Sequence, residues 1–219
     1  MFKKLKNLIS EKSKQNQFLT GAIVLAVAGI ICRVLGVIFR IPLTNIVGNF
    51  GMGIYQMVFP LYALLLIVSS AGIPIAISKM VAREMTADNK SECKKILFNA
   101  LILLSVIGLV LSLLFIIFSS QIASLQGNKD VGIIYIAIAP SVFLVCIISA
   151  LRGYFQGMQN MIPTAVSQII EQLIKMAVGI TLALMFIKTS VIMAVFGAIL
   201  AVTISEVVAL VYLLSSVAP

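Results

Sequence analysis

The sequence predicts an all-α membrane protein in which six transmembrane helices are packed together. Apolar residues make up 61% of the 219 residues and charged residues 11%, whereas soluble domains have about 45–50% and about 25%. The apolar residues also occur in runs of about 20, the length that a helix needs to cross about 30 Å of hydrocarbon. Long runs without alternation favour helices over a transmembrane β-barrel.

The chain begins with a basic segment, residues 1–17. Phe2, Leu5, Leu8 and Ile9 recur there at helical spacing, so this segment is either an amphipathic helix on the membrane surface or a frayed tail. The first apolar run extends well past a signal-peptide core of roughly 7–15 residues, which predicts an uncleaved span. The expected six-span domain, residues 18–215, contains spans at about 18–41, 54–81, 96–118, 131–151, 163–187 and 191–214.

Two stretches suggest irregular backbone. Gly48, Gly51 and Gly53 predict a flexible loop between the first two spans. Pro60 and Pro74 are expected to interrupt the second span. Near Pro74, a group of Ser and Gly residues marks a kinked or unwound stretch, which either lines a substrate site or serves helix packing.

The cations of the short loops predict the topology, because cytoplasmic loops carry an excess of Lys and Arg. Eleven fall on one side: Lys3, Lys4, Lys6, Lys12, Lys14, Lys79, Arg83, Lys90, Lys94, Lys95 and Arg152. Three fall on the other: Arg40, Lys129 and Lys188. Both termini are therefore expected in the cytoplasm, in a multi-pass protein of the cell membrane. This distribution explains the net charge of +9 without a nucleic-acid partner.

Several function classes lack their residues in this chain. There is no histidine, and Cys32, Cys93 and Cys146 form no C-x-x-C pair, so no metal site is predicted. No phosphate-binding glycine motif follows a strand. No carboxylate pair lies on a substantial loop, so we expect neither an enzyme nor a cofactor.

Charged residues inside the predicted spans are the candidate functional residues, because each central charge costs roughly 2.5–3.5 kcal/mol on the insertion scale. In the first span one narrow stripe contains Ala22, Ala26, Gly29, Arg33, Gly36 and Arg40. Small residues alone would indicate a packing seam, but guanidinium groups match the geometry of phosphate. The alternative for Arg40 is snorkelling to the interface.

The fifth span carries a second polar stripe that includes Gln168, Glu171 and Lys175. Glu171 and Lys175 are four residues apart, so they either neutralise each other or line a cavity in which Glu171 exchanges a proton or binds a cation. In the last span, Glu206 either faces such a cavity or pairs at the interface.

A series of short motifs resembles a known family. They are Arg33–Thr44, Gly48–Tyr55, Ser70–Pro74, Ser78-Lys79, Arg152–Gly157, Met161–Ala165, Ser167-Gln168 and Glu171-Gln172. In this order they resemble the stage V sporulation protein B group of polysaccharide-biosynthesis membrane proteins. That group belongs to the multidrug/oligosaccharidyl-lipid/polysaccharide (MOP) exporter superfamily. The resemblance implies two six-helix lobes around a central cavity. The chain matches the N-terminal lobe, and the C-terminal lobe is absent from it.

The resemblance also implies a function, the membrane translocation of lipid-linked oligosaccharides or peptidoglycan and polysaccharide precursors by alternating access. The implied partners are a polyprenyl-pyrophosphate-linked saccharide, membrane lipids, and a second lobe or a second copy of the chain. Related lipid II flippases carry cavity arginines on their first helix, and Arg33 and Arg40 match that pattern approximately. Together with the polar residues inside the later spans, the candidate substrate-binding residues are Arg33, Arg40, Gln168, Glu171 and Lys175, with Glu171 and Glu206 as candidates for ion or proton coupling. An Arg-Asp pair common in related lipid II flippases is missing, because Ile41 follows Arg40. The alternatives are a cation-coupled multidrug exporter and a non-transporting scaffold for cell-envelope or spore-coat assembly.

Overall fold

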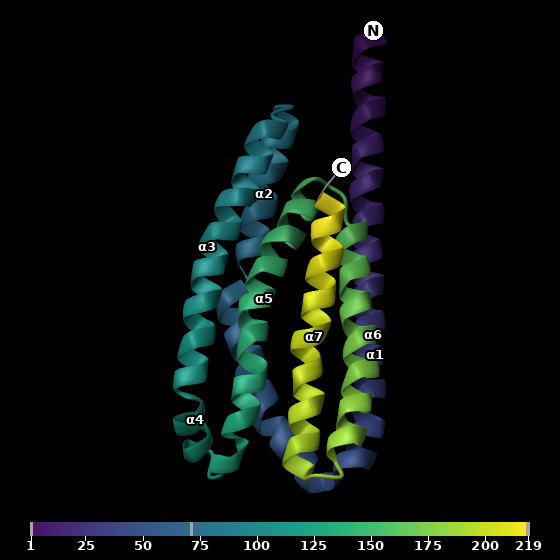
Figure 1. The fold of residues 1–219 in the computed structure, drawn as a ribbon. Coiled ribbons are helices and arrows are strands. Elements are labelled where there is room, and N and C mark those ends of the chain that lie inside the picture. The colour runs from purple at the N-terminus through teal and green to yellow at the C-terminus, as the bar shows by residue number, and fades with distance from the viewer. Residues whose placement is uncertain (1, 71, 218–219) are drawn as a thin grey trace.

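A computed structural model describes residues 2–70 and 72–217 of the chain, which are helical apart from short turns. The predicted all-α fold is confirmed (Figure 1). The elements in order are α1 (Phe2–Ser70), α2 (Ile73–Thr86), α3 (Lys90–Ile117), α4 (Ser119–Leu125), the 3-10 turn η1 (Lys129–Val131), α5 (Gly132–Gly157), α6 (Ile162–Phe186) and α7 (Val191–Val217).

Five helices among the described residues are long and apolar enough to span a membrane. The first of these segments, residues 19–64 of α1, contains Gly48, whose φ of 64° lies outside the helical region. At this glycine α1 turns back at the lower end of the bundle (Figure 1), so α1 contributes two passes and the chain six. The φ of Gly48 belongs to the left-handed region that glycine adopts without strain.

The prediction of a flexible loop from Gly48 to Gly53 is wrong except for the turn at Gly48 itself. Gly51 and Gly53 are helical, and Gly51 is buried. A Cβ atom on Gly51 would lie 2.5 Å from the Cβ of Val47 and 2.8 Å from a methyl carbon of Val191. The glycine is needed here for close packing between the turn and the start of α7, rather than for flexibility.

The predicted interruption of the second pass is confirmed at one of its two prolines. The helix α1 ends at Ser70 and α2 begins at Ile73, with Pro74 in its first turn, where a proline costs no hydrogen bond. Pro60 was expected to interrupt the span too, but it lies inside α1 without ending it. Membrane helices tolerate an interior proline where neighbouring helices accommodate it.

Close contacts between backbones hold α2 against α5. A Cβ atom on Gly153 would lie 2.8 Å from the carbonyl oxygen of Pro74, and one on Gly157 would lie 2.6 Å from the Cβ of Val81. Small residues of this kind allow membrane helices to approach closely. The contact fixes the rotation of α5, and thereby the direction in which its only arginine, Arg152, points.

The two ends of the bundle carry different loops. The start of α1, the end of α7 and the turns α2–α3 and α5–α6 lie at the upper end of Figure 1, and the turn at Gly48, α4 and the α6–α7 turn lie at the lower end. Large apolar side chains are exposed on the outer helices, among them Ile30, Phe98, Ile102, Val106 and Val211. Together with the apolar spans, these side chains indicate a multi-pass membrane protein, in which the start of α1 and the end of α7 lie at the same end of the bundle.

Candidate functional site: a charged cluster inside the lobe

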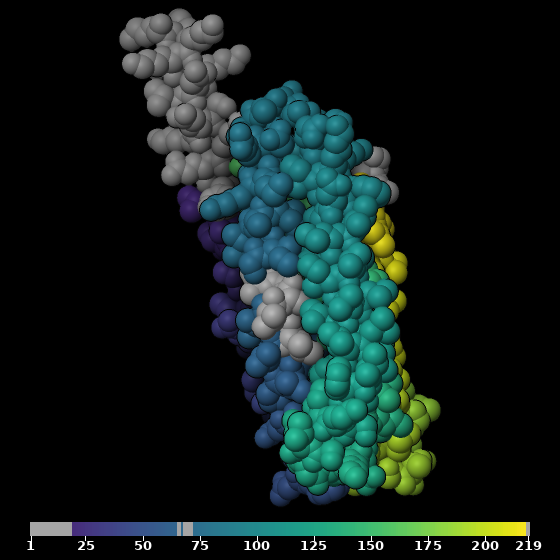
Figure 2. All heavy atoms as spheres, turned by 90° about the vertical axis from the view of Figure 1, so that its left-hand side faces the viewer, coloured from purple at the N-terminus to yellow at the C-terminus, as the bar shows by residue number. Residues whose placement is uncertain are grey.

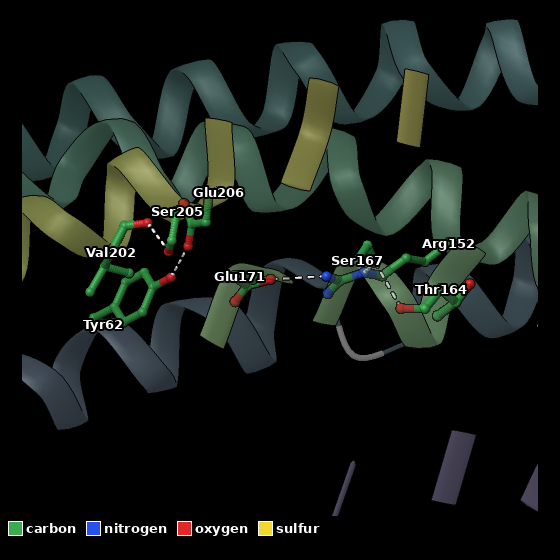
Figure 3. Close-up of polar contacts among 8 residues, drawn as sticks. All are labelled: Tyr62, Arg152, Thr164, Ser167, Glu171, Val202, Ser205 and Glu206. Carbon is green, nitrogen blue, oxygen red and sulfur yellow. Dashed lines mark hydrogen bonds and ion pairs between the residues drawn. The ribbon is translucent and has the colours of Figure 1, made fainter. Parts of the chain in front are cut away.

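An ion pair joins α5 to α6 inside the lobe. The Nη2 of Arg152 donates to Oε2 of Glu171 at 2.9 Å, and its Nε donates to Oγ of Ser167 at 3.1 Å. The Ser167 hydroxyl in turn donates to the carbonyl oxygen of Thr164 at 2.8 Å. The two charged side chains are 18% and 26% exposed, so the pair is partly shielded from the surroundings (Figure 3).

The structure decides two questions about this region. The sequence left open whether Glu171 and Lys175 neutralise each other, and the ion pair of Glu171 is instead with Arg152 of α5. Arg152 was assigned to a loop, yet it lies within α5, which continues to Gly157. The tertiary pairing is the stronger one, because a single guanidinium group binds both the Glu171 carboxylate and the Ser167 hydroxyl with separate N–H donors.

A buried hydrogen bond joins the second pass of α1 to α7. The Tyr62 hydroxyl donates to Oε1 of Glu206 at 2.6 Å. Tyr62 is 4% exposed and Glu206 is 1% exposed. Among the described residues, Oε2 of Glu206 has no hydrogen-bond partner. A buried polar atom without a partner costs free energy, so this carboxyl group is a place where a proton or cation would be stabilised.

Lys175 lies within electrostatic reach of both carboxyl groups. Its ammonium group interacts with Glu171 and with Glu206, while Glu206 also interacts with Glu171 and Arg152. Figure 3 shows Glu171 between the Arg152 guanidinium and the Tyr62–Glu206 pair. The four ionisable side chains therefore form one group, which we call the interior cluster: Arg152, Glu171, Lys175 and Glu206, with Tyr62 as the hydroxyl donor.

The other predicted site residue of α6, Gln168, is half-buried. It lies one turn before Glu171 on the same stripe. Its neighbour across that stripe, Gln172, is 7% exposed and approaches Gly36 of α1, where a Cβ atom would lie 3.2 Å from the amide nitrogen. The polar stripe of α6 therefore faces the interior of the lobe, between α6 and α1.

Arg33 and Arg40 differ from the interior cluster in their exposure. Both side chains are exposed, whereas Ala28, Phe39 and Leu43 form the buried face of the same helix. Among the described residues neither arginine makes an ion pair. The structure therefore divides the predicted residues into two sets, a carboxylate-containing interior cluster and an exposed pair of guanidinium groups on α1.

The described residues contain no cluster of three or more Cys, Asp or Glu that would hold a metal ion. The two carboxyl groups of the interior cluster come from different helices, and Arg152 already occupies one of them.

Comparison with known proteins places this helical lobe in a family. The model of the family described as polysaccharide biosynthesis protein matches residues 18–217. The chain belongs to the polysaccharide biosynthesis protein family. This family lies within the MOP superfamily, so the predicted resemblance is confirmed.

Among curated family relatives, the stage V sporulation protein B of Bacillus subtilis is 34% identical over 90% of this chain and 38% of its own length. The lipid II flippase MurJ of the same organism is 28% identical over 79% of this chain and 34% of its own length. The chain thus spans less than half the length of these relatives.

Solved structures with this fold are MATE proteins. A MATE crystallised in complex with MaD3S superimposes with a TM-score of 0.74 at 14% identity, over 90% of this chain and 45% of that chain. The eukaryotic MATE transporter AtDTX14 superimposes with a TM-score of 0.66 at 18% identity, again over 45% of its length. At these identities the likeness establishes the fold, and it supports the expected single six-helix lobe.

Two members of the interior cluster were missed as site residues in the sequence. Arg152 belongs to the family-like stretch Arg152–Gly157, but its position at the end of an apolar run suggested a loop. Tyr62 lies in an apolar run, and nothing in the local sequence relates it to Glu206, which is 144 residues away. The one usable signal was that an intramembrane carboxyl group needs a donor, and tyrosine is the only hydroxyl-bearing residue between Pro60 and Val68.

Proposed function

We propose that this chain is the N-terminal lobe of a transporter that flips or exports lipid-linked oligosaccharides, or peptidoglycan and polysaccharide precursors, by alternating access. The observation that carries the proposal is the exposed pair Arg33 and Arg40 on a membrane-spanning helix, without an ion pair among the described residues. A lone cation in a span costs roughly 2.5–3.5 kcal/mol at the helix centre. An anionic cargo that approaches this helix would offset that cost.

A polyprenyl-pyrophosphate-linked saccharide fits this requirement. Its pyrophosphate offers several oxygens to two guanidinium forks, while its polyprenyl tail remains in the hydrocarbon. One relative in the family is the lipid II flippase MurJ, which supports a cargo of this class. A multidrug exporter for organic cations would instead require exposed carboxylates near this surface, and both carboxylates of the interior cluster are at least partly shielded.

The interior cluster is proposed to couple cargo movement to protons or cations. The Arg152–Glu171 pair joins α5 to α6, and the Tyr62–Glu206 bond joins the second pass to α7. Protonation or cation binding at Glu171 or Glu206 would change these inter-helix contacts, as alternating access requires. Lys175 and Gln168 line the same side of α6 and would contribute to binding. No covalent chemistry is needed, so the protein is proposed to be a transporter and not an enzyme.

The exposed arginines indicate what kind of partner the chain needs, and the cations of the loops indicate its orientation. Exposed arginines at membrane depth need a cover of protein or water, which a second lobe or a second copy of the chain would provide. The charge bias of the loops would place both ends of the chain in the cytoplasm.

The test is a flipping assay in vesicles that contain this chain together with the remaining lobe of the transporter. Arg33→Lys should slow the flipping of a fluorescent lipid-linked saccharide, because an ammonium group lacks the bidentate fork. Arg33→Ala should slow it further, by roughly tenfold or more for the loss of a charge-assisted contact of about 1.5–3 kcal/mol. Lys188→Ala, an exposed cation in the α6–α7 turn, is the control. Wild-type rates for Arg33→Ala would reject the cargo-binding role.

A further inference from the structure

An apolar groove of about 380 Å³ lies between α2 and α3, away from the interior cluster. Its size falls within the range of about 300–1,000 Å³ that is typical of ligand sites. Three of the residues that line the groove, Gly72, Ala76 and Ala100, are small and leave space between the two helices. Asn99 is the one residue of its lining with a polar side chain.

The groove opens to the outside of the lobe. Ala76 is exposed, and Met80 and Leu103 are 54% and 59% exposed. Figure 2 shows α2 (blue) and α3 (teal) side by side on this face of the molecule. Because α3 is a membrane span, the medium in contact with this opening is the lipid bilayer.

A cation lies one helical turn beyond the lining of the groove on each of its two helices. On α2, Arg83 follows Met80 by one turn, and on α3 Lys95 precedes Asn99 by one turn. Both cations are exposed, and Lys95 forms an ion pair of 2.7 Å with Glu92. Glu84 is half-buried, and Glu92, whose side chain is 41% exposed, neutralises part of the Lys95 charge. Cations still outnumber carboxylates at this end of α2 and α3, because Lys79, Lys90 and Lys94 are exposed there too.

The groups therefore follow one another with depth as in a phospholipid. Cations lie at the end of the helices, the Asn99 amide lies about 6 Å deeper, one helical turn below Lys95, and the apolar groove continues below it. These positions match a phosphate, an ester carbonyl and an acyl chain in turn. Basic pockets between membrane helices are a known mode of anionic lipid recognition.

We propose that the α2–α3 groove binds one anionic phospholipid, with its phosphate at Arg83 and Lys95, an ester carbonyl at Asn99 and an acyl chain between Ala76 and Ala100. The bound chain fills the space beside the interruption between α1 and α2. The lipid thereby supports α2, the helix whose contact with Gly153 and Gly157 fixes the rotation of α5.

The experiment uses the absence of tryptophan from the chain. Leu103→Trp places a single fluorophore in the groove. Ile102→Trp places one at nearly the same depth on another face of α3, about 1.5 Å away along the helix axis, where Ile102 is 51% exposed. Each variant is reconstituted in vesicles containing either brominated phosphatidylglycerol or brominated phosphatidylcholine at the same mole fraction, and bromine quenching is compared.

Phosphatidylglycerol should quench the tryptophan at 103 more strongly than phosphatidylcholine does, whereas the two lipids should quench the tryptophan at 102 equally. Adding Arg83→Gln and Lys95→Gln should lower the relative affinity for phosphatidylglycerol at 103 by about fivefold per cation, the equivalent of about 1 kcal/mol each. Lys129→Gln and Lys188→Gln, at the other end of the bundle, should leave it unchanged.

Three results would overturn the proposal. One is equal quenching by both lipids at 103, which would indicate ordinary contact with bulk lipid. Another is a preference that survives the removal of both cations. The third is protection of 103 from both brominated lipids, which would indicate that a protein segment covers the groove.

Discussion

The ion pair between Arg152 and Glu171 makes a quantitative prediction about the stability of the lobe. Removing one member of a fully buried pair costs about 3–5 kcal/mol, and exposed pairs contribute about 0–1 kcal/mol. With side chains 18% and 26% exposed, either Arg152→Gln or Glu171→Gln should destabilise the lobe by about 2–3 kcal/mol, between these limits. The double variant should cost less than the sum, with a coupling of about 2 kcal/mol.

The chain contains a matched control for this measurement. Lys95 and Glu92 form a pair of 2.7 Å, but their side chains are 65% and 41% exposed. The same double-mutant cycle there should give about 0.3–0.5 kcal/mol, as expected for a pair within one exposed helix. Arg152→Lys should lose part of the coupling, since one ammonium group replaces two separately directed N–H donors.

The assay is unfolding of the purified chain in mild detergent, followed by circular dichroism as denaturant is added. A coupling between Arg152 and Glu171 below about 0.5 kcal/mol would equal that of the exposed control pair. Such a result would show that the partly shielded environment does not strengthen this ion pair.

Three further predictions concern packing, the buried carboxyl group and topology. Gly153→Ala should destabilise the chain by about 1–3 kcal/mol in the same unfolding assay, because the added carbon would lie 2.8 Å from the Pro74 carbonyl oxygen. Gly29→Ala is the control and should not destabilise the chain, because no atom lies within 4 Å of its added carbon. Tyr62→Phe removes the hydroxyl that donates to the buried carboxyl group of Glu206, and it should lower the free energy of unfolding by about 1–3 kcal/mol. An unchanged unfolding transition would show that this bond does not stabilise the fold. In a cysteine-free background, an impermeant thiol reagent added outside the cell should label a cysteine placed at Lys129 but not one at Asn89, and the reverse pattern would invert the proposed orientation.

The sequence predicted those features that depend on local composition. Apolar runs predicted the helices, and the small residues near Pro74 predicted the break between α1 and α2. The loops that share one end of the bundle could be predicted too, since the basic α2–α3 turn lies at the same end as the start of α1 (Figure 1).

The site could be predicted only in part, because it depends on how the helices are rotated against each other. The spacing of Glu171 and Lys175 along one helix offered their mutual neutralisation as one alternative. The close contact of Gly153 with Pro74 instead fixes the rotation of α5 and directs Arg152 toward Glu171. A contact of this kind joins atoms far apart in the sequence, and no periodicity within one span reveals it.

The measurement that tests the central proposal most directly uses the 219-residue chain by itself. The chain is purified in mild detergent, its mass is determined, and vesicles containing it are assayed for flipping of a lipid-linked saccharide, with and without a separately produced second lobe. We expect the chain to self-associate or to bind the second lobe through the face containing Arg33, and we expect flipping only when both lobes are present. A monomer that flips the lipid-linked saccharide alone, at the rate of the two-lobe transporter, would contradict it.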